Sequence, residues 1–205
     1  MKPCLLLSSR LRADSFNLGI ITFLSGGLAD IVTHSGNNLK IFDLVRISFN
    51  LLIIGPLFYD FITKNICQKK SKKIYQTEVF GLVFIHALFY KFFHEQMHKR
   101  FFNIHKYHHS FHENISISAA NAVSVSEFIF AYMSPFLIGS SVIVPTSESL
   151  NLAASIISFF NFAVHCDKLY DIDKWVPSFV TPKLHINHHK RMHPSTLCAP
   201  TFNFC

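Results

Sequence analysis

Long apolar runs alternate with short polar segments along the chain, and these runs set the expected architecture. The five runs are residues 16–32, 41–62, 79–93, 122–144 and 150–164. A bilayer core of about 30 Å takes about 20 helical residues. The second and fourth runs are therefore long enough to cross it, whereas the others need tilt or partial insertion. The pattern predicts an all-α membrane protein.

Composition supports the bilayer as the solvent of this chain. Half of the 205 residues are hydrophobic, 15% are charged, 23 are Phe, and the mean hydropathy is +0.30. This is too apolar for an ordinary water-soluble domain. The net charge of +7 comes from Lys and Arg that lie between apolar runs. That placement excludes nucleic acid as the partner and favours a surface of anionic lipids.

The connections between the runs predict how the chain is threaded. The first two runs and the last two are each joined by a short segment, so we expect about four transmembrane helices in two hairpins. Positive charge favours the cytosolic side. It is concentrated after the second run, at Lys64, Lys69, Lys70, Lys72 and Lys73, and also in the histidine-bearing segments. We therefore expect both regions to face the cytosol.

With both regions on the cytosolic side, the third run cannot cross the bilayer completely. Residues 79–93 form a short run with His86 near its middle, so we expect a helix that lies in the interface or dips partway. The expected organisation is an N-terminal transmembrane hairpin with a basic loop over residues 1–76. A domain with a cytosolic, histidine-lined helical cap follows over residues 77–205, and the two parts form one structural unit.

Histidines gather in tight groups, which packing alone does not predict. Twelve of the 13 lie between His86 and His193. The grouped residues are His94 and His98, then His105, His108 and His109, then His185, His188 and His189, with His165 standing alone. Residues three or four apart share one helical face about 5–6 Å apart, so each group presents two rings to one centre. If one helix ran unbroken through residues 94–109, the first two groups would project almost in line.

The number of rings limits the kind of metal site. Imidazole suits iron, zinc, copper and nickel, so the spacing alone does not choose the metal. Nine rings exceed what one tetrahedral zinc ion uses, whereas two octahedral irons that share an oxygen bridge use eight or nine.

These ordered groups resemble the histidine boxes of the fatty acid hydroxylase and sterol desaturase superfamily. The resemblance runs from about Val79 to the C-terminus and includes residues 181–189 followed by Ala199 and Pro200. Residues 105–109, 123–127 and 198–202 look closest to the cholesterol 25-hydroxylase branch.

The resemblance implies both a chemistry and a location. The nine grouped histidines would hold two non-haem irons, which use dioxygen to hydroxylate or desaturate a fatty acyl or sterol lipid. Electrons would come from NAD(P)H, through cytochrome b5 or its reductase, and the protein would lie in the endoplasmic reticulum membrane. No side chain is assigned a catalytic role, since the chemistry belongs to the metal pair.

Three departures from the family pattern bear on activity more than on fold. Glu95 stands where the family has a basic or apolar residue, and the spacer over residues 99–104 is short. The chain also stops at Cys205, where family members continue with a Trp-Asp pair and a short tail. A truncated gene model, a splice form and a divergent paralogue are all consistent with the missing end, and an inactive member of the family stays open as an alternative.

A second alternative is a membrane zinc protease. His94, Glu95 and His98 satisfy the His-Glu-x-x-His pattern, in which the glutamate serves as a general base. A single zinc site leaves both His-x-x-His-His groups unexplained.

Two smaller expectations concern the membrane boundary. Tyr90, Tyr107 and Trp175 are expected at the membrane interface, where aromatic residues with a polar end are enriched. Asn114 begins a glycosylation sequon, and we expect it to be unmodified because it follows the histidine groups on the cytosolic face.

Overall fold

The computed structural model describes residues 9–33, 39–68, 73–111, 115–172 and 182–191. Within these residues every regular element is a helix and none is a strand. In chain order the elements are α1 (Ser9–Thr33), α2 (Ile41–Phe49), η1 (Asn50–Ile54), α3 (Gly55–Asn65), α4 (Gln76–Arg100), α5 (Phe102–His109), η2 (Ser118–Asn121), α6 (Val125–Glu127), η3 (Phe128–Met133), α7 (Ser134–Ile143), α8 (Ser147–Val164), η4 (Asp167–Leu169) and α9 (Pro182–Arg191).

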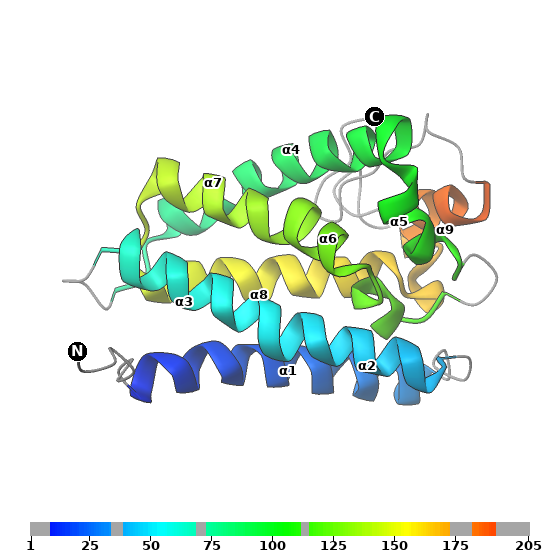
Figure 1. Ribbon diagram of the computed structural model, residues 1–205, viewed down its shortest axis with the longest axis horizontal. Helices are drawn as coiled ribbons and strands as arrows, with labels where there is room; N and C mark the ends of the chain where they lie inside the picture. The colour runs from blue at the N-terminus through cyan, green and yellow to red at the C-terminus, as the bar shows by residue number, and fades with distance from the viewer. Residues whose placement is uncertain (1–8, 34–38, 69–72, 112–114, 173–181, 192–205) are drawn as a thin grey trace, which may run out of the picture.

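The long helices lie side by side along one axis, and α5 and α9 gather with the end of α4 at one end of the bundle (Figure 1). Two long helices each contain a π-helical segment, η1 and η3, just before a proline. Pro56 and Pro135 have no backbone N–H to donate, so the regular hydrogen-bond ladder is interrupted there. The chain nevertheless continues from α2 to α3, and from α6 to α7, as one helical rod.

Within the described ranges, three helical stretches are long and apolar enough to cross a membrane. They are Ser15–Thr33, Ile41–Asn65 and Val125–Ile143. The expected class, an all-α membrane protein, is confirmed. We expected about four spans; neither α8, which contains the last apolar run, nor α4 is among these three. Much of α8 faces the protein interior, with Leu150, Ala153 and Ile157 in the apolar core.

Helix α4 contains residues 79–93, for which we expected a helix in the interface or dipping partway, and it is not among the three candidate spans. It is one continuous helix of 25 residues that packs against α7 and α8. Its N-terminal part lies beside the turn that joins α7 to α8: Thr146 donates its hydroxyl to the carbonyl of Lys73 at 2.8 Å, and its N–H to Glu78 at 2.9 Å. The other end of α4 carries His94 and His98.

His86 is the residue whose polarity led to that expectation. It is 1% exposed and packs against Phe136 at 4.5 Å between ring centroids. The ring therefore faces protein instead of lipid. Since α4 connects the two ends of the bundle, Lys73 before it and the histidines after it lie at opposite ends of the bundle, whereas we expected the basic loop and the histidines on one face of the membrane. Lys69, Lys70 and Lys72 of that loop lie outside the described residues.

This arrangement predicts that the two ends of α4 lie on opposite sides of the membrane. Ile74 and Lys106 are both exposed, one before α4 and one on α5. In sealed microsomes, a membrane-impermeant maleimide should add label to only one of the variants Ile74→Cys and Lys106→Cys, and to both after detergent is added. The parent chain, with its five native cysteines, provides the background. Equal added labelling of both variants in sealed vesicles would contradict the crossing.

Helices α1 to α3 are joined to the rest of the protein by buried polar contacts near the histidine end. The Asp30 carboxylate accepts the backbone N–H groups of Ile117 and Ser118 at 2.6 and 3.0 Å. The Asp43 carboxylate accepts the hydroxyl of Tyr107, and Asn50 donates to the carbonyl of Val123 at 3.0 Å. Each contact satisfies polar groups that would be costly to bury alone.

The structure also places two of the aromatic residues expected at the membrane interface. Tyr90 is 1% exposed and packs between His94 and Tyr132, so its placement at the interface is wrong. Tyr90 lies on the buried face of α4. The sequence did not reveal which face is buried, because apolar residues occur on all sides of that helix. Tyr107 is half-buried, beneath the guanidinium of Arg46. Trp175 and Asn114 lie outside the described residues.

Candidate metal centre

A bend between α4 and α5 brings the first two histidine groups together. Helix α4 ends at Arg100, and Phe101 adopts a non-helical conformation with φ −127° and ψ 36°. The chain then turns into α5, which packs against α4. As a result, the Nε2 atoms of His94 and His105 lie 2.9 Å apart, and those of His98 and His109 lie 3.2 Å apart. The helix is therefore not continuous, and the two groups face each other instead of projecting in line.

The end of α8 and helix α9 supply the remaining rings. His165 caps the C-terminus of α8, and its Nδ1–H donates to the carbonyl of Asn161 at 2.7 Å. Helix α9 begins at Pro182, whose fixed φ suits a first helical position. The hydroxyl of Tyr170 donates to the side chain of Asn187 at 3.3 Å, which holds α9 against the segment after α8.

All nine predicted histidines come together, in two groups. Within each group the candidate ligand nitrogens lie within 4.8 Å of one another. The first group consists of His94, His98, His105, His109 and His188, and the second of His108, His165, His185 and His189. The groups are adjacent: the stacked rings of His109 and His189, one from each group, have centroids 4.8 Å apart.

The two groups in the structure do not coincide with the histidine groups that are visible in the sequence. On α5, His105 and His109 belong to the first group and His108 to the second. On α9 the assignment is reversed, since His185 and His189 belong to the second group and His188 to the first. Residues four apart share a helical face, whereas neighbouring residues point about 100° apart. Each His-x-x-His-His sequence therefore serves two positions.

The distances within each group match neighbouring ligands of one metal ion. Metal–nitrogen bonds of about 2.0–2.1 Å at right angles place two nitrogens about 3.0 Å apart. The observed separations are 3.0 Å between the Nε2 atoms of His105 and His109, 3.0 Å for His165 and His185, and 3.1 Å for His185 and His189.

The proton positions implied by these contacts leave lone pairs that face one another. His165 uses Nδ1–H to donate to a carbonyl, so its neutral ring has a lone pair on Nε2. That Nε2 faces His185 at 3.0 Å and His108 at 3.4 Å. Lone pairs that converge in a buried space repel one another unless a cation lies between them. The donor set therefore fits a pair of transition metal ions.

Burial keeps the rings neutral, the form that binds metal. Removal from water, together with neighbouring imidazoles, lowers the pKa well below the ordinary value of 6.5 for His105, His108, His185 and His189. Burial lowers the pKa of His109 to about 3 and that of His165 to about 4. At neutral pH these nitrogens are therefore available as ligands without loss of a proton.

Glu127 is a residue of the site that sequence reasoning did not assign. Its side chain is fully buried, and Oε1 accepts a hydrogen bond from His105 Nδ1 at 2.6 Å. Ser124 fixes this arrangement, since its hydroxyl accepts the N–H of Glu127 and donates to the carbonyl of Ile104. A carboxylate that holds Nδ1–H turns Nε2 toward a metal and makes the ring a stronger ligand. The signal in the sequence was a single acidic residue near the start of the apolar run over residues 122–144.

The geometry does not place Glu95 as the general base of a protease. Its carboxylate forms an ion pair with Lys99 and is 32% exposed, and it belongs to neither of the two groups. His94 and His98 instead share their position with three more histidines. A zinc protease needs an open position on the metal with a glutamate beside it.

Fold and site together define an all-α membrane protein with two adjacent, buried groups of histidines that could hold metal ions. Residues 79–205, more than half of the chain, match the fatty acid hydroxylase family. The chain belongs to this family, which implies an oxidoreductase. Neither a curated protein nor a solved structure matches the chain.

Proposed function

We propose that the chain is a di-iron oxygenase that hydroxylates or desaturates a lipid, with the nine histidines as the iron ligands. The observation that carries the proposal is the division of these rings into two adjacent groups whose Nε2 atoms converge. Iron bound there would supply the activation of dioxygen and the oxidation of an unactivated C–H bond. In a hydroxylation, one atom of dioxygen enters the lipid. The other atom takes up two electrons and two protons and leaves as water.

The side chains of the protein hold, orient and shield this centre. The Asn161 carbonyl and the Glu127 carboxylate each fix one ring through its Nδ1–H. Eight of the nine rings are at most 1% exposed; His98 is half-buried. Water is thereby kept from the reacting atoms, which limits unproductive reactions.

Electron delivery from NAD(P)H through cytochrome b5 fits the surface at the histidine end. Exposed basic side chains lie on the elements that carry or adjoin the histidines: Lys99, Arg100, Lys106, Lys168 and Lys190. Positive charge steers an acidic redox partner toward the site and makes association sensitive to salt. The same charges favour the cytosolic side for this end of the bundle. We place the protein in the endoplasmic reticulum membrane on the family resemblance.

Metal content and lipid products test the proposal. The purified chain is expected to bind two irons, and cells that express it should accumulate an oxidised lipid that is missing in cells expressing His108→Ala. With isotopically labelled dioxygen, a hydroxylase transfers label to the lipid, whereas a desaturase leaves a double bond and no label. Asn103→Ala, an exposed change on the same helix, should retain both iron and product.

The alternatives give different results in the same experiment. One zinc per chain and loss of activity in Glu95→Gln would identify a protease. Absence of tightly bound metal, together with unchanged lipids, would identify an inactive family member. The oxygenase should retain most of its activity in Glu95→Gln, because that side chain is paired with Lys99.

A further inference from the structure

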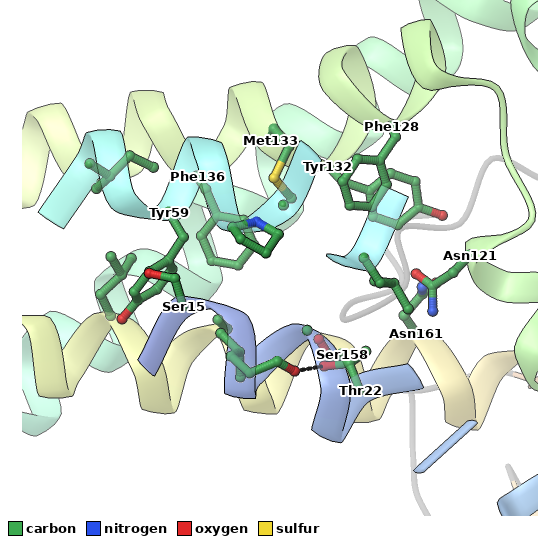
Figure 2. A pocket seen from close by; sticks show the side chains of 18 residues that line it. Ser15, Thr22, Tyr59, Asn121, Phe128, Tyr132, Met133, Phe136, Ser158 and Asn161 are labelled. Atoms are coloured by element: carbon green, nitrogen blue, oxygen red, sulfur yellow. Dashed lines mark hydrogen bonds between the residues drawn. The ribbon is translucent and has the colours of Figure 1, made fainter. Parts of the chain in front are cut away.

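A cavity of about 90 Å³ lies inside the bundle, between α1, α3, α7 and α8 (Figure 2). Apolar side chains form most of its walls, including Leu18, Leu51 and Phe136. Two of its walls belong to helical stretches that are long and apolar enough to cross a membrane, α1 and the α2–α3 rod. Such a lining suits an apolar occupant.

About half of the wall comes from outside the segment that matches the family. Helices α1 and α3 contribute Thr22, Gly55 and Tyr59, whereas the match begins at residue 79. The histidines all lie inside the matched segment. The histidine groups and about half of the cavity wall therefore lie in different parts of the chain.

The cavity is polar at one end. Asn121, Tyr132 and Asn161 lie together there, and Tyr59 lies toward the other end (Figure 2). The hydroxyl of Tyr132 donates to the carbonyl of Ala120 at 3.1 Å. The side chain of Asn161 is 3% exposed, and its Oδ1 has no hydrogen-bond partner within the described part of the chain. A buried acceptor without a donor is costly, so this oxygen calls for a donor from an occupant.

The same asparagine is next to the metal centre. Its backbone carbonyl accepts Nδ1–H of His165, a member of the second histidine group, at 2.7 Å. Asn161 and His165 are one helical turn apart, about 5–6 Å along the same face of α8. The polar end of the cavity is therefore the end near the histidines.

We propose that the cavity holds the hydrocarbon chain of a lipid whose hydroxyl or amide N–H donates a hydrogen bond to Asn161 Oδ1. The chain then extends along the bundle toward Tyr59. The position of the oxidised carbon rests on the proposed function: if the chain oxidises its lipid, that carbon lies near the polar head of the lipid and not at the far end of its chain. This assigns the substrate class as a lipid with a hydrogen-bond donor close to the carbon that reacts.

Two matched probes test the donor. One is a long-chain primary alcohol with a photoreactive diazirine in the middle of its chain, and the other is its methyl ether, which has no donor. In lipid nanodiscs the alcohol should label residues that line the cavity about tenfold more than the ether, the ratio expected for one hydrogen bond. Asn161→Leu should lower labelling by the alcohol to that of the ether. Equal labelling of the parent chain by both probes would overturn the role of Asn161.

A matched pair of variants tests the location. Ser158 lines the cavity and Ser155 is exposed, three residues away on the same helix. Ser158→Phe should abolish labelling by the alcohol, whereas Ser155→Phe should leave it unchanged. If the two variants behave alike, the cavity is not the binding site.

Binding and oxidation are measured separately, so failure of one proposal is distinguishable from failure of the other. Labelling should persist in His108→Ala, because the hydrogen bond to Asn161 needs no metal. A parent chain that is inactive but labels in this pattern supports the cavity and refutes the oxygenase. An active chain whose product is oxidised at the far end of the lipid refutes the proposed orientation and retains the oxygenase.

Discussion

Replacement of either His188 or His189 by alanine is expected to remove about half of the metal bound per chain, and replacement of both to remove nearly all of it. The two residues are neighbours on α9, but His188 belongs to the first histidine group and His189 to the second. Each single change therefore removes one ligand from a different metal position. Metal content per chain, measured after dialysis against a weak chelator, gives the result directly.

A second double variant is the decisive comparison. His185 and His189 are four residues apart and belong to the same group, so His185→Ala with His189→Ala should leave the first position loaded and retain about half of the metal. Both double variants remove two buried rings from one helix, so their effects on folding are similar. Equal metal content in the two double variants would refute the division of the histidines. Lipid oxidation should be lost in both, since each lacks a complete pair of metal ions.

Glu127→Leu is expected to lower metal affinity by about 10- to 100-fold, although the residue is not among the proposed ligands. Its carboxylate accepts Nδ1–H of His105 at 2.6 Å in a fully buried environment. Without that acceptor, the imidazole loses both its fixed orientation and the charge that strengthens Nε2 as a ligand. Competition with a chelator of known affinity, position by position, measures the change.

The conservative variant and a neighbouring position serve as controls for Glu127. Glu127→Gln keeps an oxygen that accepts the hydrogen bond but loses the charge, so its affinity should lie between the parent chain and Glu127→Leu. Ser126→Leu alters an exposed residue beside it and should leave affinity unchanged. A loss of affinity in Ser126→Leu as large as in Glu127→Leu would show that the effect comes from local packing.

The sequence was sufficient to find the candidate ligands because their signal is local. Histidines three and four residues apart share a helical face wherever that helix is placed. His165 was harder to assign, since it stands alone; only the family resemblance connected it with the others. Glu127 could not be assigned, because its partner is 22 residues away and depends on how α6 packs beside α5.

The all-α membrane class and its apolar helices were determined by the sequence alone, since a bilayer requires long apolar runs and internal backbone hydrogen bonds. Three features depended on the tertiary structure: the division of the histidines, the course of α4 from one end of the bundle to the other, and the cavity. The division follows from the bend at Phe101, a single residue whose conformation no periodicity reveals. The course of α4 along the bundle follows from its packing, in which His86 is buried against Phe136. Long-range packing, which sequence patterns do not encode in any one segment, decided all three.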